Sequence, residues 1–139
     1  MVAVLALTKP AVGSFLLLKI GRKPRPTYQP VVGGEIIEGE FRVVATPGHT
    51  EGHVSFFHLP SRNLFAGDAL AIKGGAICFM SRPVTPNLAT SWESMRVLMQ
   101  INFRYVCPGH RHPLTANVEA ERARVAEYLD KQTRWPMFG

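Results

Sequence analysis

One stretch constrains the sequence more than any other: Thr46-Pro47-Gly48-His49-Thr50-Glu51-Gly52-His53, which separates two apolar runs of strand length, 41–45 and 54–59. The stretch therefore places His49 on a Pro-Gly turn between two expected strands. Pro47 restricts the backbone φ angle, and Gly48 permits conformations that other residues avoid. A side chain held on such a braced loop suits a metal ligand, although an ordinary hairpin with a polar tip fits the same pattern.

Two later stretches place further candidate ligands at strand ends. Asp68 follows an expected strand at 64–66, and His110 follows an expected strand at 103–107 and a second Pro-Gly pair. Strand ends at one edge of a sheet converge, so we expect His49, Asp68 and His110 to lie together. Two imidazoles and a carboxylate suit zinc or a similar divalent ion, and a carboxylate can bridge two ions. Gly-Asp after a strand is also common turn chemistry, which gives Asp68 a plain structural explanation.

The order of these motifs resembles the C-terminal half of the metallo-β-lactamase superfamily. T-P-G-H-T-x-G-H, L-F-x-G-D, a helix and P-G-H follow one another between about 31 and 128. The resemblance implies an α/β (α+β) fold in which a mixed β-sheet is backed by helices, as part of an αββα sandwich. It also implies that His49 ligates a first metal, that the catalytic Asp68 bridges two metals, and that His110 ligates a second.

The chain departs from the family in lacking the H-x-H-x-D-H motif that precedes these segments there. The five histidines are His49, His53, His58, His110 and His112. Three ligands are too few for a dinuclear centre, so we expect a truncated fold with zinc or another divalent metal partly bound or absent. We also expect weak or no activity from a lone chain.

The resemblance is closest to the lactonase-like and hydroxyacylglutathione-hydrolase-like branches, which implies a lactone, thioester or other ester as a small-molecule substrate. Two alternatives stay open. Beside a hydrolase-like protein that is incomplete or inactive as a lone chain, one alternative is a non-catalytic metal-binding or interaction domain derived from the fold. The other is an active zinc-dependent hydrolase that a second chain completes.

The other histidines have separate expectations. We expect His53 to bond backbone or other groups around the ligands rather than metal. His58 lies on a strand beyond the loop and is expected to be structural or to lie on the surface. His112 follows His110 by two residues, so the two side chains share a face if the segment is extended, and His112 is a spare ligand.

The 139 residues are expected to form a single domain, 1–139. The two cysteines, Cys78 and Cys107, are too few for a disulfide framework, so a cytoplasmic location is the default. The apolar N-terminal run lacks the charge pattern of a signal peptide, and lysines interrupt it, so we expect no membrane span. The net charge is +6, with a basic cluster at 19–25. Because no nucleic-acid motif accompanies the cluster, we expect a solvated loop and no nucleic-acid partner.

Two amphipathic helices are expected to back the sheet, at 86–102 and 115–131. Their apolar faces are formed by Leu88, Trp92, Met95 and Met99 in the first, and by Val118, Val125 and Leu129 in the second. The apolar, glycine-containing segment 69–80 is expected beside Asp68. The run 12–20 fits either a strand or a buried helix.

We expect the chain to self-associate as a two-fold homodimer. The family sandwich buries one face of the sheet against the other half of the fold, and the strands here remain apolar without that half. Covering several hundred Å² of apolar surface is worth on the order of 10 kcal/mol before the costs of association. Soluble monomers avoid such a face. The alternative is that 1–20 folds over the open face and the chain stays monomeric.

Overall fold

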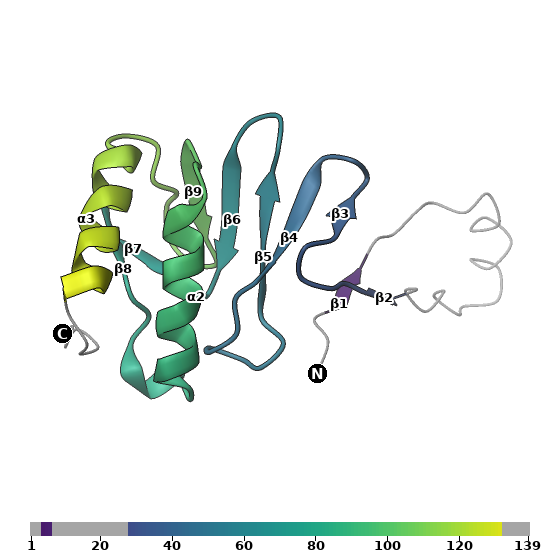
Figure 1. Ribbon diagram of the computed structural model, residues 1–139, viewed down its shortest axis with the longest axis horizontal. Helices are drawn as coiled ribbons and strands as arrows, with labels where there is room; N and C mark the ends of the chain where they lie inside the picture. The colour runs from purple at the N-terminus through teal and green to yellow at the C-terminus, as the bar shows by residue number, and fades with distance from the viewer. Residues whose placement is uncertain (1–3, 7–27, 132–139) are drawn as a thin grey trace, which may run out of the picture.

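A five-stranded sheet forms the centre of the computed structural model, which describes residues 4–6 and 28–131 (Figure 1). The strand order is β3-β4-β5-β6-β9. The first four strands pair antiparallel and β9 pairs parallel with β6, so the expected mixed sheet is confirmed. The strands are β3 (Ile36–Ile37), β4 (Phe41–Ala45), β5 (Val54–His58), β6 (Asn63–Gly67) and β9 (Tyr105–Pro108).

Two α-helices in the described part of the chain, α2 (Leu88–Gln100) and α3 (Val118–Lys131), pack on one face of this sheet (Figure 1). This arrangement confirms the expected α/β class. Both helices are shorter than expected. Asn87 caps α2, because its side chain accepts a hydrogen bond from the Thr90 N–H at 3.0 Å. Asn117 has a φ of 55°, which a right-handed helix cannot include, so α3 begins only at Val118.

The remaining elements are short. They are the pair β1 (Val4–Ala6) and β2 (Tyr28–Pro30), the hairpin of β7 (Ala71–Lys73) and β8 (Ala76–Cys78), and the 3-10 turn η2 (Arg82–Val84). The expectations for 12–20, for the basic cluster at 19–25 and for 1–20 as a cover of the sheet concern segments that lie largely outside the described residues. Within the described residues, no helix combines the length and apolar character that a membrane crossing requires.

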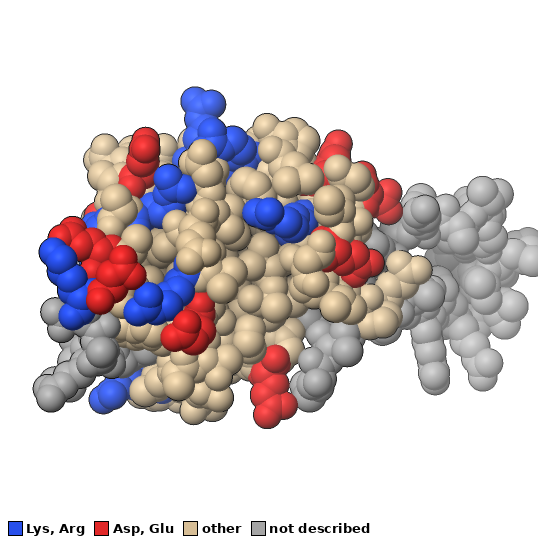
Figure 2. All heavy atoms as spheres, viewed as in Figure 1, with Lys and Arg blue, Asp and Glu red and all other residues tan. Residues whose placement is uncertain are grey.

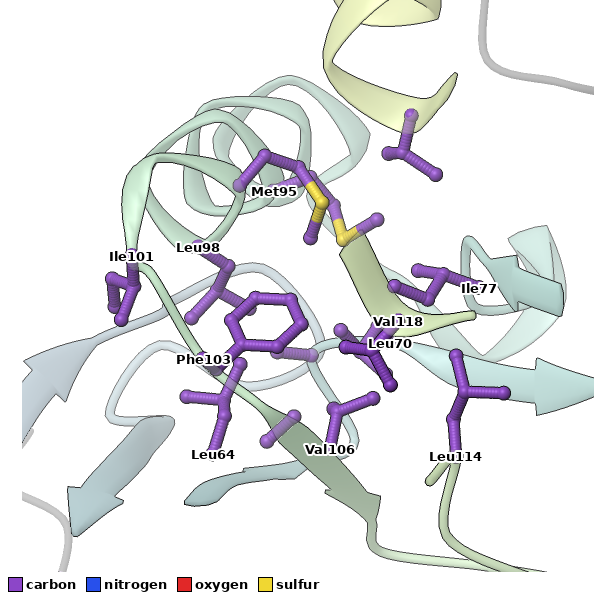
Figure 3. Packing of buried hydrophobic residues seen from close by; sticks show 14 of the residues in the cluster. Leu64, Leu70, Ile77, Met95, Leu98, Ile101, Phe103, Val106, Leu114 and Val118 are labelled. Carbon is purple, nitrogen blue, oxygen red and sulfur yellow. The ribbon is translucent and has the colours of Figure 1, made fainter. Parts of the chain in front are cut away.

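The hydrophobic core lies between the sheet and the helices (Figure 3). Leu64 of β6 and Val106 of β9 are fully buried there against Met95 and Leu98 of α2. Strand β9 begins two residues later than predicted, because Phe103 turns into this core and leaves the sheet to start at Tyr105. The strong burial of the strand residues beneath the helices fixes the register, since a one-residue slip would turn them outward.

The opposite face of the sheet carries a row of cross-strand partners, Val43, Phe56, Phe65 and Cys107. Phe65 is 40% exposed, whereas Val43 is buried and the other two are half-buried. The apolar surface on this face is therefore centred on Phe65 and is smaller than four fully exposed strands would give.

Side chains of α3 hold the β7–β8 hairpin in place. The hairpin lies outside the main sheet, so the main chain of Ile77 needs other partners. The Ile77 N–H donates to Glu121 Oε2 at 2.9 Å, and Arg124 Nη2 donates to the Ile77 carbonyl oxygen at 2.7 Å. Arg124 also contacts Glu121 at 2.8 Å, and this guanidinium holds the pKa of the Glu121 carboxyl below its usual value. In the view of Figure 2, acidic and basic side chains occur together over this end of the molecule.

Replacing Glu121 by alanine is expected to lower the free energy of unfolding by about 1–3 kcal/mol, because the Ile77 N–H loses a charged acceptor. The lowered pKa means that the carboxylate stabilises the fold at neutral pH, and that this stabilisation is lost as pH falls through the folded-state pKa. The difference between Glu121→Ala and wild type should therefore shrink in acid. Urea unfolding at several pH values measures it, with the exposed Glu119→Ala as control; equal losses for both variants would contradict this account.

Candidate metal centre

The structure brings the three candidate ligands together at one end of the sheet. His49 Nε2 lies 3.7 Å from Asp68 Oδ2, and His110 Nε2 lies 3.4 Å from Asp68 Oδ1. Each imidazole therefore faces a different oxygen of one carboxylate. His49 and Asp68 are about three-quarters buried, whereas the His110 side chain is 77% exposed.

Helix α2 braces the loop that carries His49. The Ser94 hydroxyl donates to the Pro47 carbonyl oxygen at 2.7 Å, and the Asn87 N–H donates to the Gly48 carbonyl oxygen at 3.3 Å. Gly48 has a φ of 137° and passes so close to the helix that an added Cβ would lie 2.4 Å from Ser91 Cβ. The Pro-Gly turn predicted from the sequence is thus held by a helix, in addition to the two strands.

Replacing Gly48 by alanine is expected to destabilise the protein strongly. The new methyl group meets main-chain as well as side-chain atoms of Ser91, so overpacking costs about 1–3 kcal/mol and backbone strain adds to it. Gly39→Ala is the matched control, because Gly39 also has a positive φ, 73°, but nothing lies within 4 Å of an added Cβ. Denaturant unfolding compares the two variants, and a loss no greater for Gly48→Ala than for Gly39→Ala would refute the bracing.

A glycine also lets the His110 segment pass beside Asp68. The Gly109 N–H donates to the Gly67 carbonyl oxygen at 2.7 Å, which joins the chain after β9 to the end of β6. A Cβ added to Gly109 would lie 2.5 Å from Asp68 Oδ1. The short distance between His110 and Asp68 therefore depends on the absence of a side chain at position 109.

His53 bonds groups around the candidate ligands, as expected. Its Nε2 accepts the main-chain N–H of Asp68 at 3.1 Å, and its Nδ1 lies 2.8 Å from Thr46 Oγ1. Burial lowers the pKa of His53, and the neighbouring His49 lowers it further. Thr46 Oγ1 in turn lies 2.9 Å from Ser55 Oγ. Sequence reasoning did not find Thr46 or Ser55, although two small hydroxyl residues beside a histidine loop are the signal that could have shown them.

The remaining histidines differ from each other. His58 is structural, as expected: its ring nitrogens lie 2.6 Å from Ser61 Oγ and 3.3 Å from Glu40 Oε2, at the end of β5 away from the loop. His112 is exposed, and the Asp68 contact is made by His110. The role of His112 as a spare ligand stays a prediction.

A cavity of about 340 Å³ adjoins the candidate ligands. Residues of the β7–β8 region line it, so the expectation that 69–80 lies beside Asp68 is confirmed. The lining combines apolar walls with charged and polar groups. The residues that line it are Asp68, Leu70, Ala71, Ile72, Lys73, Cys78, Phe79, Met80, Ser81, His110 and Arg111. Such a pocket suits a small molecule with an apolar portion.

The donor set fits two ions that share Asp68. Two ligands of one zinc ion lie about 3.3–3.6 Å apart when bond lengths are near 2.1 Å and the geometry is tetrahedral. The two His–Asp distances are close to this range, so His49 with Asp68 Oδ2 is one candidate half-site, and His110 with Asp68 Oδ1 is another. Each half-site has two side-chain donors, whereas tetrahedral zinc takes four.

The described part of the chain does not gather the missing donors at this site. Among the described residues, no group of three or more His, Cys, Asp or Glu side chains surrounds one ion position. The other segments, 1–3, 7–27 and 132–139, contain no His, Cys, Asp or Glu in their sequence. In addition, His49 Nδ1 is buried without a hydrogen-bond partner in the described structure, although metal-ligating histidines usually bond through the second ring nitrogen.

Comparison with known proteins identifies the family. The sequence model of the metallo-beta-lactamase superfamily matches residues 7–110, and the chain belongs to this superfamily. The chain is 31% identical over 101 residues to a hydroxyacylglutathione hydrolase of Enterobacter sp. (strain 638). The matched region covers 69% of this chain and 38% of that enzyme.

Solved structures agree with the fold. A metallo-beta-lactamase family protein from Thermus thermophilus, TTHA1429, superposes with a TM-score of 0.55 and 27% identity, over 77% of this chain and 36% of that one. TTHA1623 in a di-iron-bound form gives a TM-score of 0.56 and 25% identity, over 78% of this chain and 55% of that one. The chain therefore spans little more than a third to about half the length of these relatives.

Proposed function

We propose that this chain supplies part of the metal centre of a metal-dependent hydrolase, and that a second polypeptide supplies the remaining ligands. The observation that carries the proposal is the Asp68 carboxylate, whose two oxygens face two different imidazoles at 3.7 Å and 3.4 Å. In this proposal His49 and Asp68 hold one ion, and Asp68 and His110 hold another. No cluster of three or more His, Cys, Asp or Glu side chains occurs among the described residues, and the sequence of the other segments contains none of these residue types, which supports completion from outside.

Zinc is the proposed metal, and iron is the alternative that the di-iron form of TTHA1623 supports. When bound, such ions polarise a carbonyl group and lower the pKa of water to about 7 for zinc. The chain itself would bind and orient the substrate in the cavity beside Asp68. The apolar walls, among them Leu70 and Phe79, exclude water from one side of the site.

The proposed substrate is a carboxylic ester, a lactone or a thioester. The support is the 31% identity to a hydroxyacylglutathione hydrolase, together with a cavity that joins apolar walls to the candidate ligands. Because a half-site of two donors holds an ion weakly, we infer that an isolated chain has little or no activity. A cytoplasmic location belongs to the same proposal, and the free thiols of Cys78 and Cys107 support it.

Metal stoichiometry tests the shared carboxylate. Asp68→Ala is expected to abolish binding at both half-sites, whereas His49→Ala and His110→Ala each remove one and leave the other weakened. Equilibrium dialysis against zinc, followed by elemental analysis of the purified protein, measures the metal content, with His58→Ala as the control that keeps the wild-type value, because His58 is bonded to Ser61 and Glu40 away from the candidate ligands. Equal metal content in Asp68→Ala and wild type would refute the proposed ligand set.

We also propose that the second polypeptide is another copy of this chain, seated around Phe65 on the face of the sheet opposite α2 and α3. The outward residues of β4, β5, β6 and β9 include no Lys, Arg, Asp or Glu, as the strand registers show. Two copies that each carry a net charge of +6 can approach through an uncharged patch, and an anionic partner finds no basic group there. A two-fold pair uses the same patch twice and adds a second set of His49, Asp68 and His110.

Replacing Phe65 by glutamate is therefore expected to convert a dimer into a monomer, because it buries a charge in the contact. Light scattering at micromolar concentration gives the mass of wild type and variant. Val97→Glu is the matched control, since Val97 is 45% exposed but lies on α2. A wild-type monomer, or a dimer that survives Phe65→Glu, would rule out this interface.

A further inference from the structure

His53 belongs to a continuous chain of hydrogen bonds, called the circuit below, that lies behind the candidate ligands. The circuit runs from the Asp68 N–H to His53 Nε2 at 3.1 Å, and from His53 Nδ1 to Thr46 Oγ1 at 2.8 Å. It continues from Thr46 Oγ1 to Ser55 Oγ at 2.9 Å and ends at the Ala66 carbonyl oxygen at 3.1 Å. The circuit therefore begins and ends on the main chain at the end of β6, and it passes through the end of β4 and the start of β5.

The two main-chain ends of this circuit fix the direction of every bond in it. A main-chain N–H can only donate, so His53 Nε2 must accept and carries no proton. The neutral ring then has its proton on Nδ1 and donates it to Thr46 Oγ1. At the other end the Ala66 carbonyl can only accept, so the Ser55 hydroxyl donates to it and accepts from the Thr46 hydroxyl. Each donor in the circuit has one acceptor, and the assignment is unique.

We propose that His53 is a positioning residue for Asp68: fixed as the Nδ1–H tautomer, it holds the Asp68 main chain so that the carboxylate lies between His49 and His110. Both of its ring nitrogens are used in this role, so the ring has no free nitrogen for a metal. The effect of this positioning role on metal binding rests on the proposed function.

The geometry distinguishes this role from simple packing. A histidine that only fills space would need no particular tautomer, and an aromatic ring of the same size could replace it. Here the Asp68 N–H depends on an acceptor at the position of Nε2. Without that acceptor, the N–H of a partly buried residue is unpaired, and the chain between β6 and Asp68 can turn to seek water.

The first experiment uses the metal-free protein and does not depend on the proposed function. Long-range proton–nitrogen NMR spectra of the ¹⁵N-labelled chain report the tautomer of each histidine. The expected result is His53 protonated on Nδ1 with a slowly exchanging Asp68 amide proton. Observation of the Nε2–H tautomer, or of a rapidly exchanging Asp68 amide, would overturn the proposal even if the chain binds no metal.

The second experiment compares two replacements by direct titration with zinc and by the absorption spectrum of the cobalt-loaded protein. His53→Phe keeps a ring but lacks the acceptor, and it is expected to weaken zinc binding about 10–100-fold, as loss of an outer partner of a metal ligand typically does. His53→Gln can present an oxygen where Nε2 lies, and it is expected to restore most of the affinity and the wild-type cobalt spectrum.

The control for these variants is His58→Phe, because His58 also has both ring nitrogens hydrogen-bonded but lies away from the candidate ligands. Thermal unfolding of all variants separates a loss of stability from a loss of affinity. Zinc binding and a cobalt spectrum in His53→Phe equal to those of His58→Phe would overturn the positioning role. If the wild-type chain binds no zinc, the proposed function fails, and the NMR experiment alone decides on His53.

Discussion

The candidate centre depends on the parallel pairing of β6 with β9. Two parallel neighbours require a crossover connection, and α2 provides it between them. Since β4, β5 and β6 alternate in direction, β4 runs the same way as β6, and the ends of β4, β6 and β9 fall at the same edge. His49, Asp68 and His110 each follow one of these ends.

The same geometry explains why the supporting residues lie where they do. Strand β5 runs opposite to β4 and β6, so its start lies at the edge where the other strands end. His53 directly precedes this start and can therefore reach the Asp68 main chain. The crossover helix α2 passes the same edge at its N-terminal half, where Ser94 and the Asn87 main chain hold the His49 loop.

The sequence predicted the sheet, both helices of the described region and the meeting of three residues distant in the chain. These predictions succeeded because strand length, amphipathic spacing and Pro-Gly turns are local signals. The direction of the His53–Thr46–Ser55 bonds could not be predicted, because it depends on which main-chain groups face the ring. The same holds for the close approach of Gly109 to Asp68, which is a contact between two strand ends and leaves no local pattern.

The central claim is that one carboxylate is shared between two incomplete half-sites, and anomalous X-ray scattering at the zinc edge tests it most directly. Crystals grown with zinc should give two anomalous peaks, one between His49 and Asp68 Oδ2 and one between His110 and Asp68 Oδ1, each with further ligands from outside the chain. A single peak with Asp68 turned away, or zinc bound only at other residues, would contradict the account.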